Sequence, residues 1–240
     1  MILRDTVVEV DLRAIGANMD AICQMVGPDV AVMPVVKANA YGLGAVGVAP
    51  TLMEHGARYL AVATLSEAIE LREAYADYPL FILGHTPDRL LGIVAENNIT
   101  QTVFSKHQTE ILGKAALEKR GVSFKYKHIT DSISAVDYPE YRLNMVRPGA
   151  LVYGLRGFHK GYIEVTQAMA FKTRISQLHR IKAGEGVGYD YLWRAARDSV
   201  IATLPFGYAD GYPRNMRDKG YVTIPVSYTH LRAHETRGNL

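Results

Sequence analysis

The feature that most constrains the fold is a repeated alternation between short apolar runs and longer stretches of helical periodicity. Strand-like runs over residues 30–36, 59–64, 79–84 and 99–104 are each followed, directly or after a loop, by a helical pattern. Apolar and β-branched runs of this length favour buried strands. Repeated strand–helix units predict a parallel sheet, so we expect an α/β fold built as a (β/α) TIM-type barrel.

Capping residues mark the starts of two of these helices. Asp11 precedes a stretch in which apolar residues recur at helical spacing, namely Leu12, Ile15, Met19 and Ile22. Thr64 precedes a second helical stretch that carries the acidic Glu67 in its first turn. Short polar side chains before a helix accept hydrogen bonds from its first free N–H groups, and an acidic first turn complements the helix dipole. Both positions are therefore predicted N-caps.

The alternation of strand-like and helical stretches ends at about residue 163. Residues 163–181, 199–207 and 221–226 read as strands with turns and little helix. We therefore predict an α/β barrel over residues 1–160 and a β-rich domain over residues 161–226. Residues 227–240 resemble translated adapter sequence, and we expect them to be a non-native tail.

Composition excludes several classes of protein. A net charge of +3 with 21% charged residues and no long basic run makes nucleic acid a poor partner. Cys23 is the only cysteine, which excludes an intramolecular disulfide and fits a reducing compartment. The histidines show no metal-ligand spacing, so no metal site is expected. The N-terminus lacks the features of a signal peptide, and no apolar run is long enough to cross a bilayer. We therefore expect a cytoplasmic protein without a membrane segment.

Lys37 stands where the strand-like run 30–36 leaves the core, just before a loop with Gly42 and Gly44. Active sites of parallel barrels gather at the C-terminal ends of the strands. Two interpretations fit this position. Lys37 is either a solvated loop lysine, as most charged residues are, or an amine that forms a Schiff base with a carbonyl cofactor.

Five motifs in order decide between these interpretations, because together they resemble alanine racemases. They are VVKANAYGLG, HITDSIS, YRLNMVRPGALVYGL, GVGYDYLW and LPFGYADGYPRN, and the resemblance runs from about Arg4 to Ile224. The resemblance implies an eight-stranded barrel followed by a β-domain, with pyridoxal 5′-phosphate (PLP) as cofactor. It implies that Lys37 is the PLP lysine. It also implies racemisation of L-alanine to D-alanine, which supplies peptidoglycan synthesis.

The same resemblance assigns the residues that hold the phosphate of PLP. Tyr41 and Ser132 match the phosphate-binding tyrosine and serine, and the backbone N–H groups of Gly149 and Ala150 are expected to approach the phosphate. Without the motifs, Tyr41 reads equally well as an aromatic residue on the barrel rim. Ser132 alone reads as a helix cap.

Arg147 is expected to face the pyridine nitrogen of PLP. Arginine is always charged and cannot accept a proton, so this nitrogen stays unprotonated and the cofactor is a weaker electron sink. That property suppresses transamination and favours simple return of the proton. His128, on the preceding strand, is interpreted either as a residue that holds Arg147 or as a packed strand histidine.

Tyr189 matches the family's second catalytic tyrosine, which the partner subunit contributes. Racemisation needs an acid–base group on each face of the substrate, and Lys37 serves the other face. Tyr191 fits the motif less well. The resemblance thus implies a homodimer with an active site shared between subunits, acting on a small amino acid.

The chain departs from the family in two places. Only 118 residues separate Lys37 from Gly154, both included, whereas a (β/α) barrel takes about 250 residues. Two family motifs, one of which supplies an arginine to the cofactor, are missing, and about two βα units are expected to be absent near residues 114–118. After residue 224 the family pattern is lost, so we expect only part of the β-domain. From both departures we expect the 240-residue chain to be unstable and inactive as a racemase.

Two other functions fit part of the pattern. One is a racemase that prefers serine or accepts several amino acids, since selectivity rests on small differences in a pocket. The other is a non-catalytic PLP-binding barrel protein, which shares a strand-exit lysine but has no use for the GVGYDYLW motif.

We predict that Tyr189→Phe, in an intact parent of this chain, impairs one direction of proton transfer more than the other. The substitution removes the phenolic oxygen while Lys37 still serves its own face. Deuterium incorporation at the α-carbon, measured from each enantiomer, gives the two rates. Equal losses from both enantiomers would contradict a separate role for Tyr189.

Overall fold

The computed structural model describes residues 6–103, 105, 107–108, 126–188, 191–216, 220 and 222–223. The described elements, in chain order, are β1 (Val7–Val10), α1 (Leu12–Val26), β2 (Ala31–Val32), α2 (Lys37–Tyr41), α3 (Ala45–Glu54), β3 (Leu60–Val62), α4 (Leu65–Ala74), β4 (Leu80–Ile82), η1 (Asp88–Leu90), α5 (Leu91–Glu96), β5 (Thr100–Gln101), α7 (Ser132–Asp137), η2 (Pro139–Tyr141), β6 (Met145–Val146), η3 (Ala150–Tyr153), β7 (Met169–Lys172), β8 (Gln177–Ile181), β9 (Gly186–Val187), β10 (Trp193–Arg194), β11 (Ser199–Thr203), η5 (Tyr208–Asp210) and η6 (Arg214–Met216).

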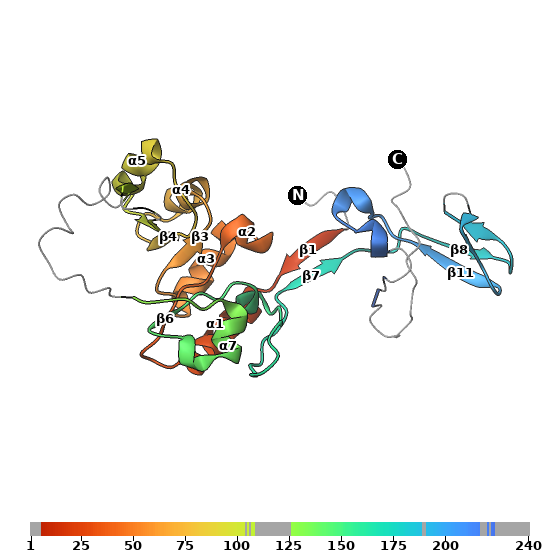
Figure 1. The fold of residues 1–240 in the computed structure, drawn as a ribbon. Helices are drawn as coiled ribbons and strands as arrows, with labels where there is room; N and C mark the ends of the chain where they lie inside the picture. Colours follow the sequence, from red (N-terminus) through yellow and green to blue (C-terminus); the bar gives the residue numbers. More distant parts are fainter. Residues whose placement is uncertain are drawn as a thin grey trace, which may run out of the picture. The chain divides into compact units, whose positions relative to one another are not determined.

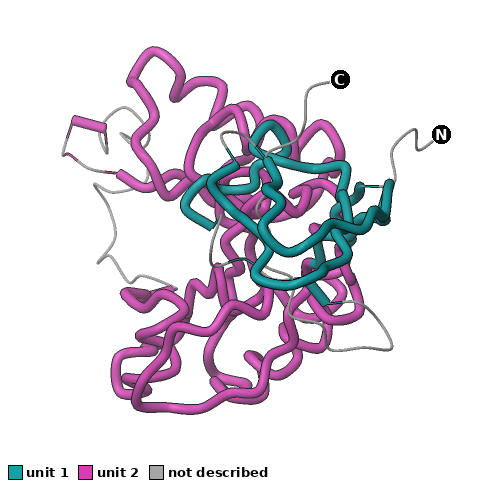
Figure 2. Tube along the Cα trace, turned by 90° about the vertical axis from the view of Figure 1, so that its right-hand side faces the viewer, with its two compact units in different colours: residues 1–9, 170–240 teal, residues 10–169 magenta. Residues whose placement is uncertain are grey.

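The chain divides into two compact units, coloured separately in Figure 2. The α/β unit is Val10–Met169, and the β unit is Met1–Glu9 together with Ala170–Leu240. The sequence placed a boundary at residue 160 and assigned the first residues to the barrel. In the structure the division falls after residue 169, and residues 1–9 group with the later segment because β1 pairs with β7.

Parallel strands run side by side through the α/β unit (Figure 1). β2 pairs with β6, and β3, β4 and β5 pair in that order, all in parallel. Two single parallel bridges, Val32 to Ala57 and Val35 to Ala61, join β2 to the β3 side. The resulting order β6-β2-β3-β4-β5 brings the C-terminal ends of these strands to one edge of the sheet. The prediction of an α/β fold with parallel strands is confirmed.

The stretch FKYKHIT, residues 124–130, is expected to follow the fourth strand–helix unit, and its described part, residues 126–130, runs beside β6 without forming a regular ladder. The backbone N–H of Arg147 donates to the Thr130 carbonyl at 3.2 Å, and the N–H of Lys127 donates to the Asn144 side chain at 2.5 Å. At the start of this segment, the rings of Tyr59 and Tyr126 meet edge to face with centroids 5.9 Å apart. The segment therefore packs the Tyr126 ring against the small buried cluster that includes Met33 and Met145.

Helix α1 shows how the sequence pattern becomes packing. The Asp11 carboxylate accepts hydrogen bonds from the N–H groups of Arg13 and Ala14, as expected for an N-cap. Three of the four periodic apolar residues are fully buried, namely Ile15, Met19 and Ile22, whereas Leu12 is 42% exposed at the helix start. Each fully buried side chain of this size stabilises the fold by about 1.5–3 kcal/mol. The core of the α/β unit is built on this helix face.

Some sequence predictions fall outside the described residues. Most of the helical pattern over residues 105–121 does so, as do most of the strand expected over 221–226 and the tail over 227–240. Among the described residues, no helix is long and apolar enough to span a membrane.

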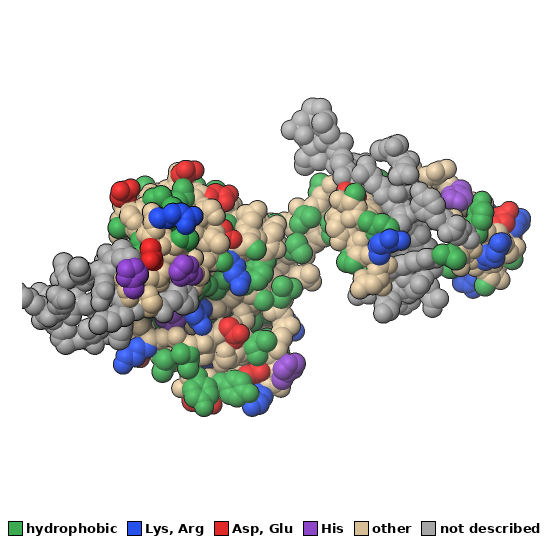
Figure 3. Space-filling view, turned by 45° about the horizontal axis from the view of Figure 1, so that its top comes forward, with side chains coloured by type: hydrophobic (Ala, Val, Ile, Leu, Met, Phe, Trp, Pro, Cys, Tyr) green, Lys and Arg blue, Asp and Glu red, His purple; other side chains and the backbone are tan. Residues whose placement is uncertain are grey.

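The β unit consists mainly of antiparallel strands. β8 pairs with β11 from Gln177 opposite Thr203 to Ile181 opposite Ser199, and the short β9 and β10 pair between them (Figure 1). Leu178 and Val200 share one face of the β8–β11 pair and are 62% and 56% exposed. Figure 3 shows hydrophobic side chains beside Lys and Arg at the surface of this unit. The predicted change to β-rich structure is thus confirmed.

The carboxylate of Asp137 fastens a long loop of the α/β unit to the end of α7. It accepts hydrogen bonds from the backbone N–H groups of His159, Lys160 and Gly161, at 2.9 Å in each case. Partial burial on its own raises the pKa of Asp137, but the three N–H donors outweigh it and hold the pKa below its usual value.

We predict that Asp137→Ala lowers the melting temperature by a few degrees at neutral pH. Because the folded-state pKa of Asp137 lies below the unfolded value of about 3.9, its stabilisation is complete above that pH and is lost as the pH falls through the folded-state pKa. Melting curves from pH 7 down to pH 3 should show the gap between variant and wild type closing below about pH 4. Glu140→Ala, at an exposed position nearby, is the control. A gap that is constant with pH would contradict this role.

Candidate functional site

Lys37 begins a left-handed turn at the C-terminal edge of the sheet. Val36 is fully buried just before it, and its N–H donates to the Ala61 carbonyl at 2.8 Å. The next four residues, Ala38 to Tyr41, have φ values from 51° to 58°. Left-handed backbone costs about 1–2 kcal/mol per non-glycine residue, and a run of four is unusual. The turn must therefore be held by its surroundings.

Three hydrogen-bonded groups hold the turn. Its far end is closed by Gly42, whose φ of 89° suits glycine and whose N–H donates to the carbonyls of Ala38 and Asn39. The side-chain carbonyl of Asn39 accepts from the N–H of Ala45 at 2.7 Å and so caps α3. At the near end, Ala38 N–H donates to the carboxylate of Glu67 at 2.7 Å.

Glu67 is a residue of the site that the sequence did not reveal. Its N-terminal position in α4 and its capping box with Thr64 are confirmed, as the spacing predicted. The structure adds a second partner on the loop that carries Lys37. The only sequence signal for this carboxylate was its place in the first turn, which does not indicate a contact 29 residues away.

Tyr41, Gly149 and Tyr153 form a close-packed cradle beside the turn. The rings of Tyr41 and Tyr153 lie 5.5 Å apart, and the buried Tyr153 hydroxyl donates to the Val35 carbonyl at 3.0 Å. A Cβ at Gly149 would lie 2.5 Å from the Tyr41 hydroxyl oxygen. Burial, and then the charge of Asp131, raise the pKa of Tyr41, so its hydroxyl stays protonated and can donate a hydrogen bond.

Ser132 lies at the same place, at the start of α7. Its hydroxyl oxygen accepts from the backbone N–H groups of Gly149 at 2.9 Å and Leu151 at 3.3 Å, which leaves its proton free to be donated elsewhere. A cavity of about 90 Å³ opens beside Ser132 and Ala150. The hydroxyls of Tyr41 and Ser132 thus both lie close to Gly149. A phosphate group needs such donors, so these residues fit the phosphate of PLP.

Arg147 directly follows β6 and is anchored by the neighbouring segment 126–130. Its side chain donates to the Ile129 carbonyl at 3.2 Å. The His128 ring packs edge to face on Phe81 at 5.7 Å, and burial, followed by the charge of Arg147, lowers the pKa of His128. Within the described residues, Nδ1 of His128 is buried without a hydrogen-bond partner. The structure therefore packs His128 against Phe81, with the Arg147 charge nearby.

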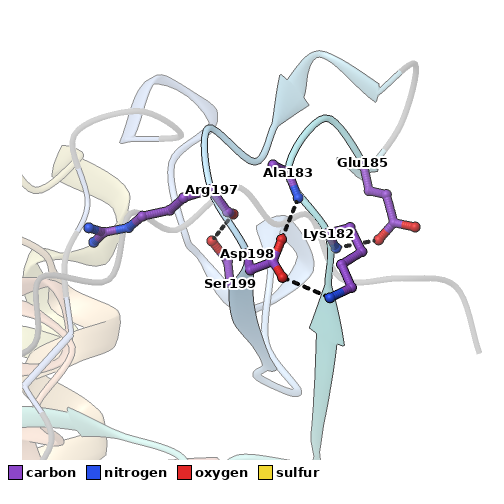
Figure 4. A network of polar contacts seen from close by, with 6 residues as sticks. All are labelled: Lys182, Ala183, Glu185, Arg197, Asp198 and Ser199. Carbon is purple, nitrogen blue, oxygen red and sulfur yellow. Dashed lines mark hydrogen bonds and ion pairs between the residues drawn. The ribbon is translucent and has the colours of Figure 1, made fainter.

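Tyr189 lies outside the described residues, so its predicted role stays a prediction. Its flanks are described: β9 and β10 pair as Val187 with Trp193 and Gly186 with Arg194. At the base of this hairpin, Asp198 accepts from the Lys182 ammonium at 2.8 Å and from the Ala183 N–H at 3.0 Å (Figure 4). The alternative residue, Tyr191, is described and is 61% exposed.

Two family descriptions match the chain in order. Residues 10–122 match the N-terminal domain of alanine racemase, and residues 168–232 match its C-terminal domain.

Individual proteins similar to this chain are also named alanine racemase. The alanine racemase of Clostridium tetani is 32% identical over 295 residues, covering 91% of this chain and 76% of that protein. Because this chain has 240 residues, the match includes stretches of the relative without a counterpart here. Among solved structures, an alanine racemase from Clostridium difficile 630 in complex with cycloserine has a TM-score of 0.78 at 26% identity, covering 91% of this chain and 77% of that one. One from Bartonella henselae, with covalently bound pyridoxal phosphate, has a TM-score of 0.77, covering 90% and 79%; at 24% identity this likeness concerns the fold alone.

We predict that Gly149→Ala weakens PLP binding by about tenfold or more, because the added methyl group displaces the Tyr41 hydroxyl or the backbone of the cradle. Titration of PLP, followed by its absorbance, measures the affinity. Gly92→Ala is a matched control, since a Cβ there meets no atom within 4 Å. Equal affinities for the two variants would show that the cradle does not hold the cofactor.

Proposed function

The chain belongs to the alanine racemase family, and from this membership we propose that its function is the PLP-dependent interconversion of L-alanine and D-alanine. D-alanine made in this way would supply peptidoglycan synthesis. We place the reaction in the cytoplasm, where the single cysteine, Cys23, would stay reduced.

The observation that carries the proposal is the convergence of Lys37, Tyr41, Ser132 and Gly149 at the C-terminal edge of the parallel strands. Two stretches of the chain, residues 37–41 and 132–149, which lie about ninety residues apart in sequence, supply an amine, two hydroxyl donors and a glycine that leaves room for a ligand. PLP, when bound, draws electron density from the α-carbon of an amino acid so that its proton can be exchanged. In this proposal Tyr41 and Ser132 donate to the phosphate, with the backbone at Gly149 and Ala150 close by.

Proton exchange needs one residue on each face of the substrate. Lys37 would exchange the α-proton on one face, and the hydroxyl of Tyr189 from a partner subunit would do so on the other. The exposed apolar residues Leu178 and Val200 give the β unit a surface suited to a homodimer. Arg147, fixed by the carbonyl of Ile129, would keep the pyridine nitrogen unprotonated because a guanidinium cannot accept a proton.

We also propose that two βα units of the family barrel are absent from this chain. The described strands have the order β6-β2-β3-β4-β5, with residues 126–130 beside β6. That makes six strand positions where the family fold has eight. The longer matched stretch of the Clostridium tetani relative supports the same interpretation. The expected places of the missing units, near residues 114–118, lie outside the described residues.

Two alternatives remain for the substrate and the activity. A preference for serine, or for several amino acids, would leave the cradle unchanged. A non-catalytic PLP-binding protein would also use Lys37, but it gives no reason for the β9–β10 hairpin around Tyr189. We therefore favour a racemase.

The proposal is tested by locating the cofactor. Wild-type chain incubated with PLP, reduced with borohydride and digested should carry the pyridoxyl group on Lys37, and Lys37→Ala should lose it. Lys160→Ala, at an exposed lysine whose amine contacts Tyr138, should behave like the wild type. A pyridoxyl group on another lysine would overturn the assignment.

Racemase activity is tested on two chains in parallel. The 240-residue chain as written should show little conversion of L-alanine to D-alanine, because an open barrel leaves strand edges and apolar surface exposed. A chimera that receives two βα units of the Clostridium tetani relative between residues 114 and 118, and that relative's C-terminal segment after residue 224, should show conversion. Full activity of the chain as written would contradict the proposed deletion.

A further inference from the structure

We propose that Glu67 is a positioning residue for Lys37: its carboxylate joins the left-handed turn after Lys37 to the loop that follows β3. The inference rests on the proposed function in one respect, since Lys37 is taken to be the PLP lysine. It adds a residue from α4, outside every motif that suggested the function.

The geometry divides the two oxygens of Glu67 between two loops. Oε2 accepts from the N–H groups of Ala63 at 2.8 Å and Thr64 at 3.2 Å. Oε1 accepts from the N–H of Ala38 at 2.7 Å, the shortest of the three bonds. One half-buried carboxylate thus bridges the loop after β2 and the loop after β3.

A capping role explains only one half of this arrangement. In the capping box, the Thr64 hydroxyl accepts from the Glu67 N–H at 3.4 Å and Oε2 accepts from the Thr64 N–H. The capping box makes no use of Oε1, the second carboxylate oxygen of Glu67. That oxygen instead meets the first amide of the strained turn.

The contact matters because of where the turn begins and ends. Lys37 and Tyr41 stand at its two ends, and Ala38, Asn39 and Ala40 between them have left-handed φ values of 51° to 53°. Such backbone persists only where the surroundings impose it. Glu67 supplies the acceptor for the amide directly after Lys37, and so fixes the point at which the lysine side chain leaves the backbone.

Charge makes this bond stronger than a neutral one. A carboxylate that accepts from backbone N–H groups forms shorter and stronger hydrogen bonds than an amide oxygen does. Glutamine at position 67 has one acceptor oxygen and one NH₂ group. Whichever way the amide turns, the NH₂ group would point a donor at another donor, either Ala38 N–H or the pair Ala63 and Thr64 N–H.

The experiment compares Glu67→Gln with Thr64→Ala in the full chain. Thr64→Ala removes the hydroxyl that caps α4 but leaves the bond between Ala38 and Glu67. It therefore controls for any effect that comes only from weaker capping of the helix. Glu70→Gln, at an exposed position of the same helix, controls for the change of charge. Two readouts are measured on each protein. One is the rate at which PLP becomes borohydride-trappable on Lys37, and the other is deuterium exchange of the Ala38 amide without PLP.

We expect Glu67→Gln to slow the trapping on Lys37 by about tenfold, the equivalent of about 1.4 kcal/mol, and to speed exchange of the Ala38 amide. Thr64→Ala and Glu70→Gln should leave both readouts near the wild type. Equal effects of Glu67→Gln and Thr64→Ala, or no effect of Glu67→Gln, would overturn the inference. If Glu67→Gln does not fold, wild-type exchange decides: a protected Ala38 amide supports the inference, and unprotected exchange overturns it.

Failure of the proposed function has a different signature. A wild-type chain that takes no PLP on Lys37 overturns that function, and the exchange of the Ala38 amide then decides alone whether Glu67 holds the turn.

Discussion

The site depends on one pairing, that of β2 with β6. Ala31 lies opposite Met145 and Val32 opposite Val146, so two short strands more than a hundred residues apart in sequence run in parallel. The ladder continues past the strands, where Met33 N–H donates to the Val146 carbonyl and Val35 N–H donates to the Pro148 carbonyl. Because parallel strands end at the same edge of a sheet, the loop that follows β2 lies next to the loop that follows β6. This is why the turn after Lys37 lies against Gly149.

At this edge, backbone strain and close packing support each other. Four successive left-handed residues are unfavourable by themselves. They are held from outside by Glu67, by the cap that Asn39 makes on α3, and by the contact of Tyr41 with Tyr153. Tyr153 is in turn fixed by its bond to the carbonyl of Val35, two residues before Lys37. Contacts between the loops therefore set the shape of the site. The β2–β6 pairing decides which residues of the two loops lie opposite each other.

A group of aromatic rings lies against the parallel strands of the α/β unit. Tyr59, just before β3, Phe81 in β4 and Tyr126 in the segment before α7 bring their aromatic rings together. They pack against a small buried cluster formed by Met33, Val35, Ala61 and Met145. The hydrophobic core around α1 is separate from this cluster, and it is the larger of the two. The packing of the first helices therefore rests on a different set of side chains from that beside the aromatic rings.

The sequence by itself determined the elements and the chemistry of single residues. Asp11 and Thr64 marked helix starts because their side chains bond to amides only two or three residues away, and the spacing of Ile15, Met19 and Ile22 marked a buried face. Motif resemblance singled out Lys37, Tyr41 and Ser132. Tertiary structure decided what no local pattern encodes. The Glu67 bond to Ala38 crosses 29 residues, the contact of Tyr41 with Gly149 needs the β2–β6 pairing, and β1 joins β7 rather than the first sheet. Those contacts depend on how distant segments meet in space, and a periodicity of two or 3.6 residues carries no record of that.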